Sequence, residues 1–333
     1  MCPVRVIAEV GVNHNGSIDT ALRMVRAAAD AGADIVKFQT FSASSLVSTS
    51  APKAAYQAER TGGGGQLEML RALELTRDDH IRLMEACRSA GVAFLSAPFD
   101  LDSVDLLAGL GVSEVKIASG EITDLPLLRR VGAMRVPVVL STGMSTTAEI
   151  GAAIAALEAA GAQRDGITLL HCTSEYPTPA EDVNLLAMTA MAEEFGLPVG
   201  YSDHTEGIMV ALAAVARGAV LIEKHFTLDR SMPGPDHAAS LEPGEFAEMV
   251  RGVHIVGRAL GDPVKRPVAG ESGVATVARK SIVAARDIEP GEILSDANLT
   301  TKRPATGISP MRWDEVVGRA ASRSYARDEV IEP

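Results

Sequence analysis

Residues 4–40, "VRVIAEVGVNHNGSIDTALRMVRAAADAGADIVKFQT", contain a strand pattern, a helix pattern and a second strand pattern in succession. The apolar runs over 4–12 and 35–40 are of the length and composition typical of buried strands. Between them, "TALRMVRAAADAG" has the amphipathic spacing of a helix, and Gly32 is placed to end it. A strand, a helix and a further strand in this order form the repeating unit of α/β proteins.

The same unit recurs along most of the chain. Strand patterns follow at 92–99, 115–120, 136–143, 167–173, 198–205 and 221–227, each with helical sequence after it. Eight strand–helix units in about 260 residues favour a closed (β/α)8 barrel, a TIM barrel, over an open doubly wound sheet. The first strand is not followed by a glycine-rich dinucleotide-binding motif, which also argues against the open sheet.

The sequence changes character from Asp262. "DPVKRPVAGESGVAT" is rich in Pro, Gly and Ser and lacks periodicity, so we assign residues 1–261 to the barrel and 262–275 to a linker. Residues 276–333 have short strand patterns and a Pro290-Gly291 turn, which predict a small, mostly β domain. A domain of this size buries little core by itself, and we expect it to dock against another surface.

The composition excludes several classes of protein. A net charge of −12 over 333 residues argues against a broad nucleic-acid or anionic-membrane surface, which requires clustered Lys and Arg. It does not exclude a small anionic substrate, because a few buried cations can set the charge of a pocket. Three scattered cysteines do not make a disulfide framework. With no long apolar run and no signal-peptide pattern, we expect a cytoplasmic protein.

Polar residues occupy alternate positions at the ends of several predicted strands. Lys37 and Gln39 share one face of the second strand, and Glu223 and His225 share one face of the eighth. His204, near the end of the seventh strand, precedes His225 by one strand–helix repeat. In barrel enzymes the chemistry lies at the carboxyl ends of the strands. Two imidazoles at similar height could therefore hold a divalent metal, with oxygens from water or substrate.

Each of these side chains also has a structural interpretation. His204 and His225 could be hydrogen-bonded core histidines, and we expect this for His171. The lysines at 37 and 116 could extend along the barrel rim. Glu9 and Glu121, near strand ends, could be their ion-pair partners.

Eight motifs in order give a more specific interpretation. "AEVGVNHNG", "VKFQT", "KIASGE", "LSTGM", "HCTSEYPTP", "GYSDHT", "EKHFTLDR" with "MPGPDH", and "KRP" resemble the sialic acid synthase family, which includes N-acetylneuraminate and legionaminate synthases. The resemblance implies a barrel followed by an antifreeze-like SAF domain, in a domain-swapped homodimer. It also implies condensation of phosphoenolpyruvate with an N-acetylmannosamine-type sugar to a nine-carbon 2-keto acid, with Mn2+, Mg2+ or Co2+ as cofactor.

The resemblance also assigns roles to residues of this sequence. Glu121 would stabilise the positive charge of the reacting enol ether and help to deliver water. The full set implied is metal ligands His204 and His225; phosphoenolpyruvate contacts Lys37, Gln39, Lys116 and Ser119; catalytic carboxylates Glu121, Glu9 and Glu223; and sugar contacts Tyr176, Asp236 and, from the other subunit, Arg303.

Two departures from the family pattern leave the sugar open. Ala97 stands in "SAPF" where relatives have S-T-P-F, so either phosphoenolpyruvate binds more weakly or Ser96 or a backbone N–H replaces the missing hydroxyl near the phosphate. Ser174 stands where some N-acetylneuraminate-forming members have Asn. A diacetamido-trideoxy sugar leading to legionaminic acid and a sugar for spore-coat polysaccharide are alternatives. A non-catalytic carbohydrate-binding protein is an alternative of another class.

Overall fold

The computed structural model describes residues 4–48 and 65–332. It divides into two compact units, Met1–Gly261 and Asp262–Pro333, and each is described by itself below.

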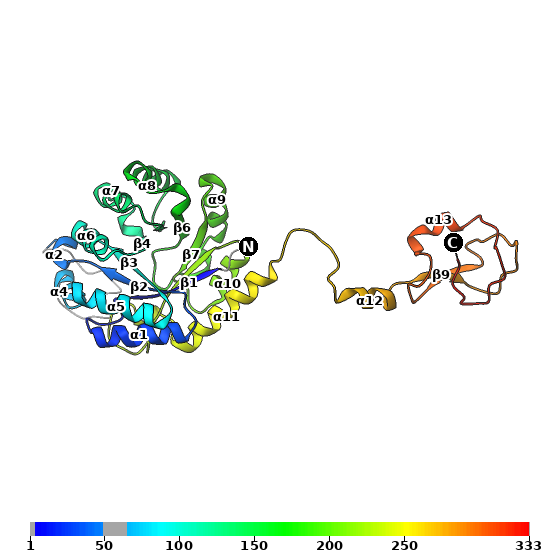
Figure 1. Ribbon diagram of the computed structural model, residues 1–333, viewed down its shortest axis with the longest axis horizontal. Helices are drawn as coiled ribbons and strands as arrows, with labels where there is room; N and C mark the ends of the chain where they lie inside the picture. The colour runs from blue at the N-terminus through cyan, green and yellow to red at the C-terminus, as the bar shows by residue number, and fades with distance from the viewer. Residues whose placement is uncertain (1–3, 49–64, 333) are drawn as a thin grey trace. The chain divides into compact units, whose positions relative to one another are not determined.

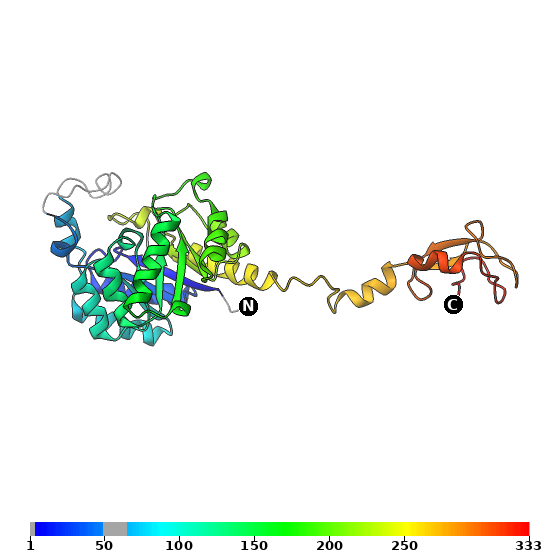
Figure 2. The ribbon, with the colours of Figure 1, turned by 90° about the horizontal axis from the view of Figure 1, so that it is seen from above.

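The first unit is a ring of eight strands surrounded by helices (Figure 1, and from above in Figure 2). Its strands are β1 (Arg5–Gly11), β2 (Ile35–Thr40), β3 (Ala93–Pro98), β4 (Val115–Ile117), β5 (Val138–Ser141), β6 (Ile167–His171), β7 (Val199–Asp203) and β8 (Leu221–His225). Its described helices are α1 (Ile18–Asp30), α2 (Ala43–Leu46), α4 (Gln66–Arg71), α5 (Arg77–Ala90), α6 (Leu101–Leu110), α7 (Leu125–Met134), α8 (Thr147–Ala160), α9 (Leu185–Phe195), α10 (Met209–Ala216) and α11 (Pro243–Ala259).

The eight strands form one parallel sheet in the order β3-β2-β1-β8-β7-β6-β5-β4. The two outermost strands of this order, β3 and β4, also lie next to each other, so the sheet curves round into a barrel. The predicted (β/α)8 fold is confirmed. The strand predicted over 115–120 is shorter than expected, because the chain leaves β4 at Ile117 and forms a 3-10 turn, Ser119–Glu121.

Local sequence accounts for where the helices begin and end. Ser17 caps α1 by accepting a hydrogen bond from the N–H of Thr20 (3.2 Å). Thr146 forms a capping box with Glu149 at the start of α8. Gly161 ends α8 with a positive φ of 120°, a conformation that glycine adopts without the steric cost of a Cβ. These signals mark where α1 begins and where α8 begins and ends.

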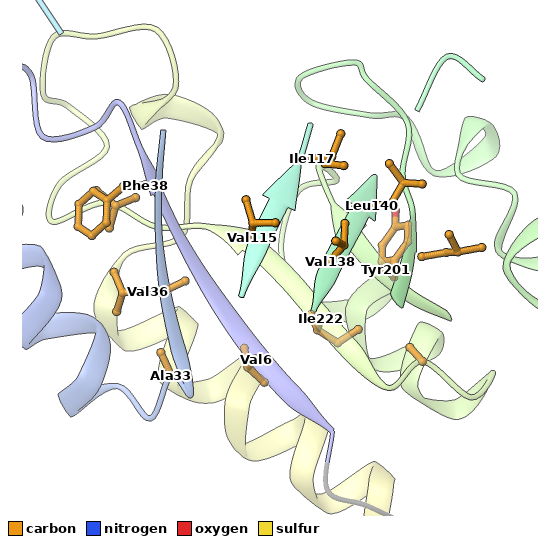
Figure 3. Close-up of a cluster of buried hydrophobic side chains, with 14 of the residues drawn as sticks. Val6, Ala33, Val36, Phe38, Val115, Ile117, Val138, Leu140, Tyr201 and Ile222 are labelled. Carbon is orange, nitrogen blue, oxygen red and sulfur yellow. The ribbon is translucent and has the colours of Figure 1, made fainter. Parts of the chain in front are cut away.

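The strands bury both of their faces. Outward side chains such as Val6, Val36 and Ile222 pack against the helices in the main core (Figure 3). Inward side chains form a second, smaller apolar layer inside the barrel, made of Ile7, Ile35, Leu95, Val139, Leu170 and Leu221. The next inward position toward the carboxyl end is polar on several strands. The barrel therefore has an apolar floor beneath a polar layer.

The second unit has its own small core. It contains α12 (Glu271–Ala278), a two-stranded antiparallel sheet of β9 (Ser281–Ala284) and β10 (Leu299–Lys302), and α13 (Trp313–Val316). Its core includes Ile282, Leu299 and Tyr325. Helix α12 begins inside the segment interpreted as a linker, where the sequence showed no helical period. Within 4–48 and 65–332, no helix combines the length and apolar character needed to cross a membrane.

Candidate active site

A cavity of about 320 Å³ lies where the carboxyl ends of the barrel strands meet. All of the predicted site residues except Glu121 and Arg303 line it. Some reach it as inward side chains of β1, β2, β4 and β8, and others because they follow the carboxyl ends of strands, as Ser119, Tyr176, His204 and Asp236 do. Lys37 pairs in register with Glu9, and Glu9 with His225, so these side chains stand at one level.

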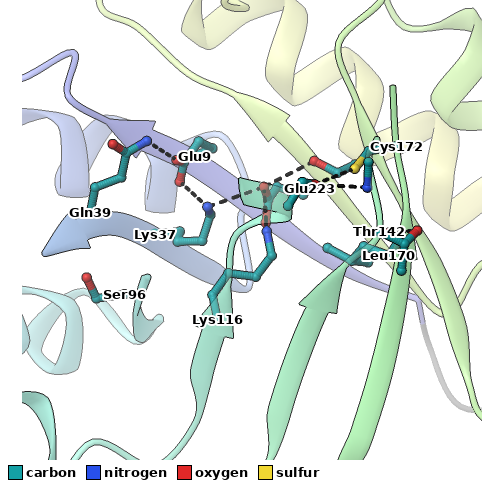
Figure 4. Close-up of polar contacts among 12 residues, drawn as sticks. Glu9, Lys37, Gln39, Ser96, Lys116, Thr142, Leu170, Cys172 and Glu223 are labelled. Carbon is teal, nitrogen blue, oxygen red and sulfur yellow. Dashed lines mark hydrogen bonds and ion pairs between the residues drawn. The ribbon is translucent and has the colours of Figure 1, made fainter. Parts of the chain in front are cut away.

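Four buried charges form a connected network across the cavity (Figure 4). Lys37 Nζ lies 3.1 Å from Glu9 Oε2 and 3.3 Å from Glu223 Oε1. Lys116 Nζ lies 2.9 Å from Glu223 Oε2. Gln39 donates a hydrogen bond to Glu9 Oε1 (3.3 Å). Glu9 is therefore an ion-pair partner of a lysine, and the partner of Lys116 is Glu223.

The two lysines differ in how strongly they hold their protons. Burial alone would lower the pKa of Lys37, but the charges of Glu223 and Glu9 outweigh it and raise that pKa. Burial lowers the pKa of Lys116, and Glu223 offsets this only in part. Lys37 faces two carboxylates and Lys116 faces one, which explains the difference.

The two carboxylates are shifted in opposite directions. Burial would raise the pKa of Glu223, but Lys116 and Lys37 outweigh it and hold that pKa below its usual value. For Glu9 burial is the larger effect, and it raises the pKa despite Lys37. The network pairs two ammonium groups with two carboxyl groups. An entering anion therefore has to replace carboxylate contacts on the lysines.

Two imidazoles stand on the β7–β8 side of the cavity. The ring centroids of His204 and His225 are 5.6 Å apart. His204 Nδ1 lies 2.6 Å from the carbonyl oxygen of Thr173, an arrangement that places the proton on Nδ1 and leaves a lone pair on Nε2. Burial lowers the pKa of His204 to about 4, so this imidazole is neutral at neutral pH. Neutral imidazole is the form that binds metals.

The donor set fits a divalent ion with two protein ligands. Nδ1 of His225 is buried and has no hydrogen-bond partner in the described structure. Burial lowers the pKa of His225 well below its usual value, and His204 adds to this. Among the described residues no cluster of three or more His, Cys, Asp or Glu side chains could hold a metal. An ion between these imidazoles would thus complete its shell with oxygens from water or substrate.

Tyr176 and Asp236 also line the cavity. The ring of Tyr176 packs 4.2 Å from that of His204 and edge-on to that of His225, centroid to centroid 5.6 Å. The loop that carries Asp236 is held by Asn13. Asn13 Nδ2 donates to Ser240 Oγ (2.9 Å), and Ser240 Oγ donates to the carbonyl oxygen of Asp236 (2.7 Å). Asn13 is thus a positioning residue that the motif analysis did not assign.

Ser119 sits in a tightly packed corner of the cavity. Its Oγ accepts a hydrogen bond from the N–H of Gly143 (3.0 Å) and lies 3.2 Å from Cys172 Sγ. A Cβ on Gly143 would come within 2.8 Å of Ser119 Oγ and 2.3 Å of Ser174 Oγ. Glycine is therefore required at 143 for both serines to face the cavity.

Sequence reasoning also missed Ser202. Its Oγ donates to Glu223 Oε1 (3.1 Å) and lies 3.5 Å from His204 Nε2, so it joins the ion-pair network to the imidazoles. Side chains two positions apart along a strand share a face, so the pattern that predicted His204 could also have predicted Ser202.

Some residues lie elsewhere. Glu121 follows the cavity-lining Gly120 but is not among the residues that line the cavity. Burial, with Asp124 and Asp100 adding to it, raises the pKa of Glu121 to about 7. Arg303 belongs to the second unit, where it is exposed. His171 Nε2 lies 2.7 Å from the carbonyl oxygen of Val183, as expected of a structural histidine.

The expectation that Ser96 replaces the hydroxyl missing at Ala97 is wrong. Ser96 Oγ donates to the carbonyl oxygen of Phe38 (3.1 Å) and lies 2.6 Å from Thr40 Oγ1, which also contacts His80 of α5. Ser96 therefore faces the helix layer. Ala97, which pairs in register with Gln39, takes the inward position.

Comparisons with known proteins show the family of the chain. The model of the NeuB family matches residues 24–265, and that of the SAF domain matches residues 279–333. The chain is 50% identical over 327 residues to N,N'-diacetyllegionaminic acid synthase of Campylobacter jejuni, covering 98% of each chain. It is 45% identical over 324 residues to the enzyme of that name from Legionella pneumophila, covering 96% of this chain and 91% of the relative.

A solved structure is also similar. The crystal structure of N-acetylneuraminic acid synthetase from Leptospira borgpetersenii, in complex with citrate, aligns with a TM-score of 0.72 and 34% identity. The alignment covers 82% of this chain and 90% of that one.

Proposed function

Since the chain belongs to the NeuB family, we propose that it condenses phosphoenolpyruvate with an N-acetylated amino sugar, releasing phosphate and forming a nine-carbon 2-keto acid. The observation that carries this proposal is the division of one cavity. One part of it holds two buried lysines paired with Glu223, and another holds two neutral imidazoles, which Ser202 joins to the same carboxylate.

Phosphoenolpyruvate suits the lysine side. Its phosphate and carboxylate are anionic, and Lys37 and Lys116 can give both of them charge-assisted hydrogen bonds. Burial strengthens these contacts relative to water, because less solvent screens them. Gln39 and Ser119 border the same side and supply neutral donors.

The sugar suits the imidazole side. Its open-chain form has an aldehyde, and Tyr176 and Asp236 can orient the hydroxyl groups of the chain. A divalent ion such as Mn2+, held by His204 and His225, supplies Lewis acidity toward the aldehyde oxygen when bound.

Bond formation joins C3 of phosphoenolpyruvate to the aldehyde carbon, whose oxygen takes a proton to become a hydroxyl. C2 is left with positive charge, which Glu9 and Glu223 stabilise because both line the cavity. Water then adds to C2 and gives up a proton. We assign this proton to Glu9, whose pKa is raised, with Glu121 beside the site as a second candidate. Breaking the bond between C2 and the phosphate oxygen expels phosphate, which takes the proton of the C2 hydroxyl as the keto group forms. The proton that the water gave up balances the one taken by the aldehyde oxygen.

The sugar we propose is 2,4-diacetamido-2,4,6-trideoxymannose, because the two relatives at 50% and 45% identity are N,N'-diacetyllegionaminic acid synthases. The test is phosphate release from phosphoenolpyruvate by chelator-stripped protein with Mn2+ added back, comparing this sugar with N-acetylmannosamine and with no sugar. We expect release that requires both a sugar and Mn2+, and that is faster with the trideoxy sugar. Sugar binding without phosphate release would instead favour a carbohydrate-binding protein.

We also propose a homodimer in which Arg303 of one copy completes the site of the other. Two inactive variants should then restore activity when they are combined in one dimer. Chains carrying Arg303→Ala and chains carrying His225→Ala should each be inactive alone and regain activity when mixed, since one composite site in each heterodimer is intact. Differently tagged chains, purified through both tags, provide the measurement. Inactive heterodimers would rule this arrangement out.

A further inference from the structure

One side of the cavity is apolar. Five apolar residues, Val12, Met69, Leu70, Leu73 and Phe99, line it and are here called the apolar wall. Val12 follows β1, Phe99 follows β3, and Met69 and Leu70 belong to α4, with Leu73 just after it. None of these side chains can donate a conventional hydrogen bond to a sugar.

The apolar wall is supported by a core of its own. It packs with Phe41 and Leu46 into a cluster that is separate from the main barrel core. Phe41 and Phe99 meet edge to face, with ring centroids 6.4 Å apart and an interplanar angle of 86°. Leu73 is 7% exposed. Side chains packed in this way are held in place, so the apolar wall has a defined shape to offer a ligand.

The rest of the cavity already accounts for the polar parts of the two substrates. The lysines suit the anionic groups of phosphoenolpyruvate, and the imidazoles suit the aldehyde. A substrate hydroxyl placed against the apolar wall would lose its hydrogen bonds to water without gaining others, whereas a methyl group would gain contact and lose nothing.

We propose that the apolar wall is a specificity determinant that selects an amino sugar ending in a methyl group over one ending in a hydroxymethyl group. This inference rests on the proposed function and deepens it. An apolar pocket discriminates against a single added hydroxyl by about 100-fold at most. We therefore expect the wild-type chain to prefer the methyl sugar by on the order of 10- to 100-fold in kcat/KM.

The test uses two sugars that differ by one oxygen. These are 2,4-diacetamido-2,4,6-trideoxymannose and its 6-hydroxy counterpart, each measured by phosphate release from phosphoenolpyruvate with Mn2+. In Leu73→Gln, an amide replaces part of the apolar wall at similar volume, and the preference for the methyl sugar should fall about tenfold or more. The ratio of the two kcat/KM values is measured on one preparation, so partial loss of folded protein cancels.

Leu75→Gln is the matched control. Leu75 is partly buried against the main core, is not among the residues lining the cavity, and should keep the wild-type ratio. Met69→Gln provides a second variant in case Leu73→Gln does not fold.

The outcomes are distinct. A lowered ratio in either wall variant, with an unchanged ratio in Leu75→Gln, supports the proposal. Turnover of both sugars at equal kcat/KM by the wild-type chain overturns it and leaves the proposed reaction in place, as does an unchanged ratio in both wall variants. Absence of phosphate release with every sugar overturns the proposed function and this inference with it.

Discussion

Glu223→Gln is expected to lower the free energy of unfolding by about 3–5 kcal/mol and to remove phosphate release, because it takes the shared carboxylate away from two buried lysines. Lys116 then loses the ion-pair partner within its reach, and Lys37 keeps only Glu9. Urea unfolding followed by circular dichroism measures the stability. Glu193→Gln, on the exposed face of α9, should stay within about 0.5 kcal/mol of the wild type.

The stabilisation that Glu223 contributes should depend on pH. The pKa of Glu223 is held below its ordinary value of 4.5, so its stabilisation is present above that pH and is lost as the pH falls toward the folded-state pKa. The gap between wild type and Glu223→Gln should therefore narrow as the pH falls below about 4.5. A loss of less than about 1 kcal/mol at neutral pH would mean that the lysines find other partners.

His225→Ala should weaken Mn2+ binding by at least about 100-fold, since even changes outside the ligands of a metal cost 10- to 100-fold in affinity. Phosphate release should fall with it, because one of the two imidazoles that face the cavity is gone. Isothermal titration of chelator-stripped protein with Mn2+ measures the binding directly, independently of turnover.

His171→Gln is the matched histidine control. His171 is hydrogen-bonded to Val183 and does not line the cavity, so Mn2+ affinity should be unchanged in this variant. Equal Mn2+ affinity in His225→Ala and the wild type would remove His225 from the metal site.

Much of the fold could be predicted from local pattern. Apolar runs, helix caps such as Thr146 and stop glycines such as Gly161 each depend on residues close in sequence, so the eight strand–helix units were visible. Side chains alternate between the two faces of a strand, so the sequence also predicts which of them point inward. Lys37, His204 and His225 could be predicted as site residues for this reason. Helix α12 was not predicted, because its segment has little helical periodicity and begins with Gly270, Ser272 and Gly273, residues that are typical of linkers.

The sequence by itself therefore determined which side chains face the barrel interior, because that follows from a period of two along each strand. Only the tertiary structure decided their partners. Lys116 meets Glu223, which is 107 positions away, and not Glu121 nearby. It also decided that the hydroxyl of Ser96 contacts Phe38 and Thr40, and that α4 contributes Met69 and Leu70 to the apolar wall. These contacts depend on strand register and barrel closure, which join residues whose separation in sequence carries no local signal.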